Sequence, residues 1–302
     1  MELYHADPCE GPSISSSGLR TIHADSPAHY WVHSPYNPKR IEETTTAAFV
    51  LGRAAHHLLL GEDNFSTSFI VRPDELAGKA WQGNRTECKD WLAKQEASGR
   101  TVLTPAQIES IRGMAYALAA HPLIDAGMLN GSIEQSMFWK DHETGIWLKS
   151  RPDAIPNDSG DFADLKTTTH FGFDLDRDVS NYRYDMQAAL AGMGCRALLG
   201  REMESFSLVF VGKEPPYCVE ILTLDKEDIQ RAERDIRVAI DTFAWCMEHG
   251  NWFGPQGTQL DARYVRISDW AKTNADYRSD FLKREIARAE AVTSEVEYAG
   301  AP

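Results

Sequence analysis

Near residue 131 the sequence changes from long helix-forming stretches to short runs typical of β-strands. These runs are rich in β-branched and aromatic residues, and Gly, Asp, Asn and Pro separate them. We predict strands at residues 132–140, 146–155, 161–168, 205–212 and 218–224. Strands of this kind need a second layer to cover the sheet that they form, so the pattern favours a domain that contains both strands and helices.

Helical patterns precede, interrupt and follow the predicted strands. We expect a short helix at about 16–23, after three serines, and longer helices at 45–61, 74–98 and 104–120. A helix at about 182–199 separates the third strand from the fourth, and a long one at 226–249 follows the fifth. This order predicts an α/β fold with a mixed central sheet flanked by helices and a helical N-terminal part.

The length and composition suit one large domain. No linker is visible within residues 10–270, so we expect a single domain over 1–270, with a helical part of about 1–130 and a core of about 131–250. Residues 271–302 form a charged tail. No apolar run approaches the roughly 18 residues that span a bilayer. The acidic, proline-broken start does not resemble a secretory signal, so we expect a cytoplasmic protein without membrane contact.

Charge and cysteine content exclude some classes of protein. The net charge of −14 argues against a chain that coats nucleic acid without specificity, because Lys and Arg drive phosphate binding. An acidic surface can still surround a locally basic cleft. The five cysteines contain no CxxC pair, which argues against a zinc site or an iron–sulfur cluster.

Asp153, Asp164 and Lys166 form the most informative group of residues. Asp164 and Lys166 lie two residues apart on one predicted strand, and Asp153 lies near the end of the preceding one. Residues i and i+2 of a strand point to the same face, so a carboxylate and an ammonium project side by side. Two carboxylates suit Mg²⁺ or Mn²⁺, and a lysine beside the metal can position a water or stabilise developing negative charge.

An Asp-x-Lys triplet alone is usually part of a solvated face, and the preceding Arg-Pro-Asp makes this one more specific. The same tripeptide also occurs at Arg72-Pro73-Asp74, in a predicted turn that no Asp-x-Lys follows. We therefore interpret the first copy as structural and Arg151-Pro152-Asp153 as part of a site.

Three further residues are candidates for the same site. His56 lies in an otherwise apolar helix next to His57, and the sequence does not choose between the two histidines. Glu134 opens the first predicted strand, and Gln187 shares one helix face with Tyr184. Taken singly, each has an ordinary alternative: a core histidine, a solvated glutamate and an unremarkable helix residue.

The sequence resembles the RecB-like branch of the PD-(D/E)XK nucleases in the order of its motifs. These motifs are GxxxH, an upstream Glu, RPD, DLKTT and a YxxQ helix. Within this branch, the chain is similar to the exonuclease VIII (RecE) type, which is found in phages and prophages. The similarity lies in the segments ISSSGLRTIHADSPAHY and TGIWLKSRPDAI and in the late turn Trp252-Phe253-Gly254. The resemblance covers about residues 10–265 and implies a restriction-endonuclease-like core.

The resemblance implies a metal centre. Asp153 and Asp164 would bind the catalytic metal, with the carbonyl of Leu165 as a further ligand. His56 would contact a second metal or the phosphate, and Glu134 would hold a water on the metal. The metal itself would be Mg²⁺, for which Mn²⁺ can substitute.

The resemblance also implies catalytic roles. Lys166 would orient the attacking water, and Gln187 would match the glutamine of a QxxxY motif. The tyrosine position of that motif is Ala191 here, which leaves Tyr184, one turn earlier, as the candidate replacement.

Members of this type degrade linear double-stranded DNA from 5′ ends and leave 3′ single strands. They work beside a RecT-like single-strand annealing protein and can form ring-shaped homo-oligomers.

One alternative is another RecB-like nuclease, of the endonuclease, repair or adaptation type. Such nucleases commonly carry a four-cysteine iron–sulfur cluster, and only one cysteine, Cys246, lies in the C-terminal region of this chain, which argues against them. The other is an inactive DNA-binding module, which the intact acidic and lysine positions disfavour.

An acidic protein that acts on DNA needs local cations. Arg53, Arg151 and Arg183 are nearest to the predicted site in sequence, and Tyr184 and Gln187 are further candidate DNA contacts. The alternative is that these arginines pair with surface carboxylates, in which case the next candidates are Lys79, Arg85 and Lys89.

Overall fold

The computed structural model describes residue 4 and residues 8–42, 44, 46–61, 65–155, 159–258 and 261–299. Contacts along the chain divide it into two units, Met1–Gly257 and Thr258–Pro302. Within its described residues the second unit contains the helix α12 (Asp269–Ala299). The first unit holds the sheets and every residue that the sequence predicts to be functional.

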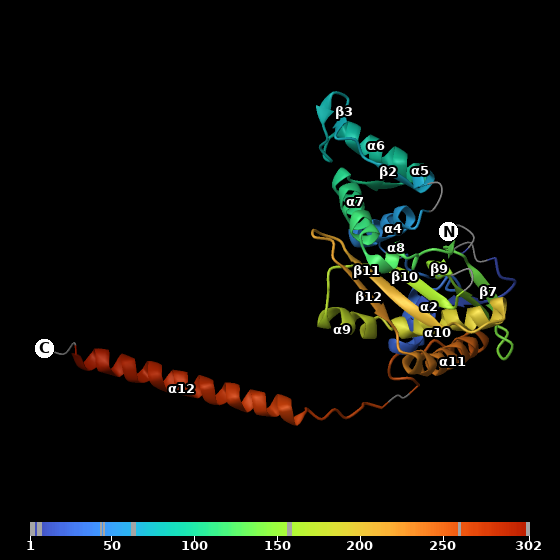
Figure 1. The fold of residues 1–302 in the computed structure, drawn as a ribbon. Helices are drawn as coiled ribbons and strands as arrows, with labels where there is room; N and C mark the ends of the chain where they lie inside the picture. Colours follow the sequence, from blue (N-terminus) through green and yellow to red (C-terminus); the bar gives the residue numbers. More distant parts are fainter. Residues whose placement is uncertain are drawn as a thin grey trace. The chain divides into compact units, whose positions relative to one another are not determined.

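A five-stranded sheet with the order β12-β11-β10-β9-β6 lies at the centre of the first unit (Figure 1). β10 (Asp161–Thr168) and β11 (Ser205–Gly212) run parallel through eight residue pairs, and β12 (Val219–Thr223) is antiparallel to β11. β9 (Ala154–Ile155) and β6 (Ser132–Ile133) extend the other edge as short antiparallel strands. The sheet is therefore mixed, and the last three predicted strands are confirmed.

The first two predicted strands, 132–140 and 146–155, are each divided between two sheets, so their prediction as unbroken strands is wrong. The first consists of β6 and β7 (Met137–Lys140), and Glu134 between them has a left-handed backbone with φ 52°. The second consists of β8 (Trp147–Ser150) and β9, separated at Pro152, which has no N–H to donate to a ladder. β7 and β8 join β1 (Ser13–Ser15) in a three-stranded sheet.

Helices cover both faces of the central sheet, with a hydrophobic core on each. α2 (Ser16–Ala24), α10 (Tyr184–Gly194) and α11 (Lys226–His249) lie on one face, and α4 (Ala47–Leu59) and α7 (Pro105–Ala119) on the other (Figure 1). The sheet contributes Phe162, Phe206, Leu208 and Phe210 to the first core, and Leu165, Val209 and Val211 to the second. The predicted α/β fold with a mixed, helix-flanked sheet is confirmed.

The helices predicted at 16–23, 45–61, 104–120 and 226–249 are confirmed, as α2, α4, α7 and α11. The helix predicted at 74–98 is wrong over its first half. β3 (Glu75–Leu76) and β4 (Lys79–Ala80) form a hairpin there, with φ of 52° at Ala77 and 70° at Gly78, and α6 (Thr86–Ala97) begins later.

The helix predicted at 182–199 begins two residues later, because Arg183 has a left-handed backbone with φ 51°. It ends in a π-helical turn, Cys195–Leu199. The remaining elements are α3 (Pro27–His33), α5 (Phe65–Ser68), β2 (Phe69–Val71), β5 (Thr101–Leu103), α8 (Pro122–Asp125) and α9 (Phe173–Asn181).

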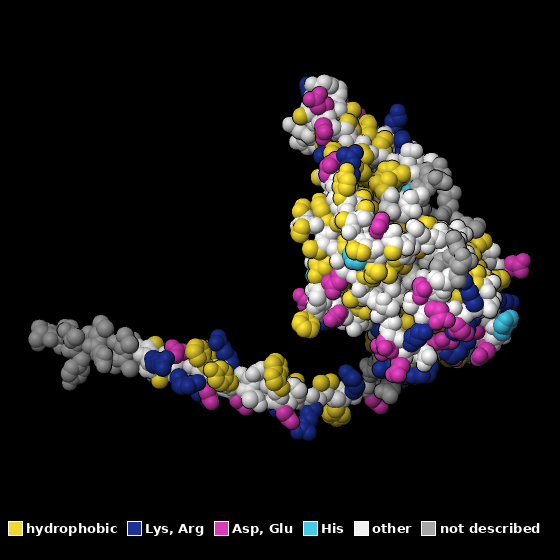
Figure 2. Space-filling view, viewed as in Figure 1, with side chains coloured by type: hydrophobic (Ala, Val, Ile, Leu, Met, Phe, Trp, Pro, Cys, Tyr) yellow, Lys and Arg dark blue, Asp and Glu magenta, His cyan; other side chains and the backbone are white. Residues whose placement is uncertain are grey.

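Charges of both signs intermingle over the side that α10 and α11 present in Figure 2. Ion pairs between such charges include that of Arg196, in the π-helical turn after α10, with Glu202 at 3.2 Å. In the described part of the chain, no helix is both long enough and apolar enough to cross a membrane. Cys88, Cys195 and Cys246 are buried thiols.

Candidate active site

Strand β10 carries Asp164 and Lys166 on one face of the central sheet. Their side chains form an ion pair, and the Lys166 ammonium lies 5.4 Å from the centre of the Tyr184 ring. Asp164 is 1% exposed, so its carboxylate is almost completely removed from water. Because alternate residues of a strand point to opposite faces, the side chain of Leu165 lies in the second core instead.

Asp153 reaches the same place from the turn between β8 and β9. Its Oδ2 accepts a 2.6 Å hydrogen bond from the backbone N–H of Leu165, which holds the carboxylate against β10. Its carbonyl accepts a 3.0 Å hydrogen bond from the N–H of Glu134. The interruption of the two predicted strands therefore brings Glu134 and Asp153 together.

Helix α4 supplies a histidine, and the structure distinguishes between the two neighbours. His56 Nδ1 lies 3.4 Å from Asp153 Oδ2. His57 is 5% exposed and packs edge-on against Phe65 and Phe69, with ring centres 5.7 Å away in both cases. His56 therefore faces the carboxylates, and His57 belongs to the core.

Helix α10 places two side chains beside β10. Gln187 Nε2 donates a 2.7 Å hydrogen bond to Asp164 Oδ1, and Tyr184 lies beside Lys166. Ala191 is 1% exposed within the first core. The position where the resembled family has tyrosine therefore lies away from the carboxylates, whereas Tyr184 lies next to them.

Arg20 of α2 also lies at this place, although the sequence did not single it out. Its guanidinium lies 5.9 Å from the centre of the Tyr184 ring and donates a 2.6 Å hydrogen bond to the carbonyl of Tyr182. Burial lowers the pKa of Arg20, and Coulombic interactions with Tyr184 and Asp164 partly offset this lowering. A signal was available, because Arg20 is the only Lys or Arg within ISSSGLRTIHADSPAHY.

These residues line one open cavity of about 620 Å³. It brings together most of the predicted site residues: His56, Glu134, Asp153, Asp164, Lys166, Tyr184, Gln187, Arg53 and Arg151. Leu165 approaches it only through its backbone. Arg183 does not line the cavity; it forms ion pairs with Asp185 at 3.0 Å and Asp235 at 2.6 Å.

Two carboxylates and two cations in the cavity have shifted pKa values. Burial and the charge of Asp153 raise the pKa of Asp164, although Lys166 opposes this change. Burial also acts to raise the pKa of Asp153, but His56, Lys166 and the Leu165 N–H lower it overall. For His56 and Lys166, burial acts to lower the pKa, and the facing carboxylates raise both pKa values overall. The buried carboxylates and the partly exposed cations therefore stabilise each other's charged forms at the wall of the cavity.

The chemistry of the cluster fits a divalent metal ion. Ligand atoms of His56, Glu134 and Asp153 all lie within 4.8 Å of one another. One imidazole nitrogen and two carboxylate oxygens suit a divalent cation that keeps water ligands, such as Mn²⁺ or Mg²⁺. Asp164 lies outside this triad, but the charge of Asp153 acts to raise its pKa, so a cation held by the triad would offset that repulsion.

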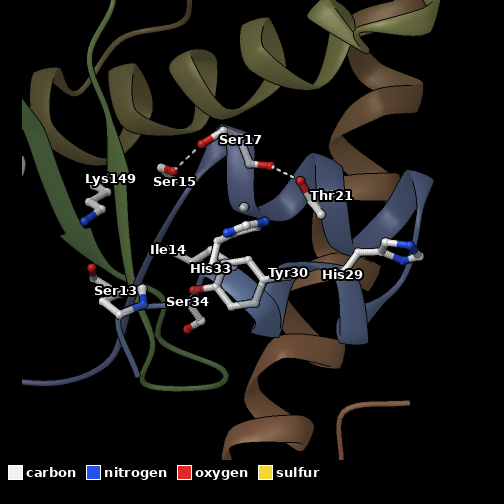
Figure 3. Close-up of a pocket in the computed structure, with 12 residues that line it drawn as sticks. Ser13, Ile14, Ser15, Ser17, Thr21, His29, Tyr30, His33, Ser34 and Lys149 are labelled. Carbon is white, nitrogen blue, oxygen red and sulfur yellow. Dashed lines mark hydrogen bonds between the residues drawn. The ribbon is translucent and has the colours of Figure 1, made fainter. Parts of the chain in front are cut away.

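A second hollow, of about 250 Å³, lies against another face of α2. Figure 3 shows Ser15 and Ser17, joined by a 2.9 Å hydrogen bond, and the rings of His33 and Tyr30 around it. None of the described residues that line this hollow is acidic. The carboxylate cavity is therefore the better candidate for metal chemistry.

Among curated proteins, none matches this chain. Among solved structures, the fold is similar to that of a candidate exonuclease from Eubacterium rectale, with a TM-score of 0.59 and 13% identity over 88% of this chain and 95% of that one. At this identity the likeness shows the fold alone. An alkaline exonuclease from Laribacter hongkongensis has a TM-score of only 0.27, with 13% identity over 55% of this chain and 86% of that one. A family described as "PDDEXK-like domain of unknown function (DUF3799)" matches residues 15–258, and the chain therefore belongs to it.

Proposed function

We propose that this chain is a divalent-metal-dependent exodeoxyribonuclease that acts on linear double-stranded DNA. The observation that carries the proposal is the convergence of Asp153, Asp164 and Lys166 with His56 and Glu134 in one cavity. These residues come from four separate segments of the chain. Burying several charged groups together costs free energy, so a fold retains such a group most readily when a bound ion or substrate uses it.

The chain's own residues would divide the work as follows. When bound, a divalent cation supplies Lewis acidity that polarises the scissile phosphate. His56, Glu134 and Asp153 would hold the cation, and Gln187 keeps the Asp164 carboxylate in a fixed orientation. Lys166 would position a water for attack on phosphorus and balance the negative charge that develops on the phosphate.

Arg151 is suited to hold a phosphate of the substrate. Its Nε lies 2.6 Å from Oε2 of Glu134, and its guanidinium carbon lies 5.1 Å from the centre of the Tyr4 ring. Arg151 lines the cavity, so a phosphate oxygen bound there would gain a charge-assisted hydrogen bond from its guanidinium. Arg20 and Arg53 line the same cavity, which gives a local group of cations in a protein with a net charge of −14.

The sequence resemblance to the RecE type extends the proposal. The enzyme would degrade DNA in the 5′-to-3′ direction and leave 3′ single strands for recombination by annealing. Mg²⁺ would be its metal, with Mn²⁺ as a substitute. A RecT-like single-strand annealing protein would be its partner, and a ring-shaped homo-oligomer its assembly. Membership of the PDDEXK-like family supports the nuclease part of this proposal, and the finer parts rest on the motifs.

Digestion of linear duplex DNA, labelled at either the 5′ or the 3′ ends, tests the proposal. In Mg²⁺, labelled 5′ nucleotides should be released first, covalently closed plasmid should remain intact, and EDTA should stop the reaction. Rapid nicking of the closed plasmid would favour a RecB-like endonuclease instead. Binding of DNA without cleavage in either Mg²⁺ or Mn²⁺ would favour an inactive DNA-binding module.

A further inference from the structure

Two exposed aromatic side chains, Phe49 and Tyr182, line the cavity that contains the carboxylates. Each is 59% exposed. Phe49 belongs to the first turn of α4, and Tyr182 lies between α9 and α10, so the two rings come from separate walls. Removing a large aromatic side chain from water is favourable, so a flat group of a ligand that covers either ring would be stabilised.

Both rings are attached to a fixed backbone. The N–H of Phe49 donates a 3.1 Å hydrogen bond to Thr46 Oγ1, the cap of α4. The N–H of Tyr182 donates to the Asp178 carbonyl at 2.9 Å, and its own carbonyl accepts the hydrogen bond from Arg20. Tyrosine and phenylalanine have only two side-chain torsions, so rings on an anchored backbone lose little entropy when a ligand stacks on them.

Their position distinguishes these rings from ordinary exposed aromatics. Single exposed apolar side chains are common on protein surfaces and need no explanation. Phe173 of α9 is such a residue, because it is 88% exposed and does not line the cavity. Phe49 and Tyr182, in contrast, share one cavity with Asp153, Lys166 and the cations described above.

We propose that Phe49 and Tyr182 stack on unpaired nucleobases of the strand whose phosphodiester lies at Asp153 and Lys166. This inference rests on the proposed DNA nuclease function. The cavity combines charged groups with exposed aromatic rings, and a nucleic acid strand combines anionic phosphates with flat bases that stack on such rings.

The proposal specifies the form of the substrate at the site. Bases inside a duplex present only their edges in the grooves, and only the terminal pair exposes a flat face, whereas stacking on a side chain needs such a face. Stacking of interior bases on Phe49 and Tyr182 therefore needs a strand that is unpaired near the cleaved bond. The enzyme would act on single strands or on frayed duplex ends, and it would act more slowly on a blunt end that is held closed by strong base pairs.

Binding to a labelled single-stranded oligonucleotide, measured by fluorescence anisotropy with Ca²⁺ in place of Mg²⁺ to block cleavage, tests the stacking. Stacking of one base on an aromatic side chain corresponds to about 5- to 150-fold in Kd. Phe49→Ala and Tyr182→Ala should each weaken binding within that range. Phe49→Trp and Tyr182→Phe keep a ring and should bind as the wild type does. Phe173→Ala is the matched control and should leave Kd unchanged.

An oligonucleotide that is abasic throughout its length separates stacking from other effects. Wild type and both alanine variants should bind this strand equally, because it offers the rings no base. Equal affinity of wild type and both alanine variants for the base-containing strand would overturn the proposal. An equal loss on both strands would overturn it too, since the rings would then act through the fold; thermal unfolding of each variant shows whether the fold has changed.

Cleavage by the wild type, measured in parallel, separates this inference from the proposed function. If the wild type degrades DNA but binds it with the same Kd as the alanine variants, the stacking is rejected and the nuclease function stands. A wild type that cleaves no DNA in Mg²⁺ or Mn²⁺ rejects the function, and the affinities then decide the stacking independently.

Discussion

The tripeptide Arg-Pro-Asp occurs at residues 72–74 and again at 151–153, in two very different surroundings. In the first copy, Asp74 is exposed and the guanidinium of Arg72 lies 5.3 Å from the centre of the Trp81 ring. In the second copy, Asp153 is only 5% exposed and accepts the hydrogen bond from the Leu165 N–H.

The difference shows what the tripeptide determines and what it does not. Proline follows the end of a strand in both copies, because β2 ends at Val71 and β8 ends at Ser150. After the first copy the chain enters an exposed hairpin, and after the second it enters β9, which pairs with the buried β10. The tripeptide thus interrupts the strand, and the neighbouring strand decides whether the aspartate is exposed or buried beside other charged groups.

Replacing the aspartate of each copy should give the largest contrast. Asp153→Ala removes a proposed metal ligand, so we expect loss of detectable DNA cleavage and weaker Mn²⁺ binding in calorimetry. Asp164→Ala should behave similarly in cleavage. Asp74→Ala, at an exposed position in a hairpin region, should leave both measurements unchanged. A fully active Asp153→Ala enzyme would remove Asp153 from the proposed site.

Replacing a lysine near each copy should also give different turnover numbers, with a smaller contrast than replacing the aspartates. Lys166→Ala should reduce turnover by roughly 10²-fold or more, the scale for removing a group that stabilises charge in the transition state. Mn²⁺ binding should persist, because lysine is not a ligand, and Lys166→Arg should restore activity only in part. Lys79→Ala, in the exposed hairpin, is the control. Single-turnover rates near wild type for Lys166→Ala would contradict the assigned role.

The arginines of the two copies should differ in how DNA binding depends on salt. Arg151→Ala should flatten the plot of log affinity against log salt concentration by about one unit, because it removes one phosphate contact. Arg72→Ala should leave the slope unchanged, since Arg72 lies against Trp81 instead. Titrations in Ca²⁺ give both slopes. Identical slopes for Arg151→Ala and wild type would direct the search for the phosphate contact to Arg20 and Arg53.

The smallest effect concerns the stability of the first copy. Arg72→Ala should lower the free energy of unfolding by about 0.5–1 kcal/mol, because it removes a cation–π contact with Trp81 near the surface. Urea denaturation of Arg72→Ala, Trp81→Ala and the double variant isolates the coupling between the two side chains. Strictly additive losses would show that the contact contributes nothing beyond the two residues separately.

Regular periodicity made part of this molecule predictable. β10, β11 and α11 have the predicted bounds, and the alternation along β10 places Asp164 and Lys166 on one face. The left-handed conformation of Glu134 could not be predicted, because glutamate rarely adopts it and the residues that Glu134 contacts, Arg151 and Asp153, lie in another segment of the chain. The Ala77-Gly78 turn had a visible signal in its glycine, but the polar residues around it also fit a helix.

The site was predictable only where its residues lie on elements with a clear pattern. Asp153, Asp164 and Lys166 lie close in sequence, and strand geometry relates them. Arg20 donates to a residue 162 positions away, and no local pattern encodes such a contact. Arg183 lies within a predicted helix, but its left-handed backbone accompanies contacts with Asp185 and Asp235 outside the cavity.

The hydrogen bond between Arg20 and Tyr182 has a consequence for how the protein is made. The cavity needs residues from Arg20 to Gln187, and β10 acquires its parallel neighbour only when Ser205–Gly212 has been synthesised. A chain that has not yet emerged from the ribosome as far as Gly212 therefore lacks a complete cavity. Under the proposed function, such a partial chain would be harmless to nearby DNA, and activity would appear only after β11 has been synthesised and has paired with β10.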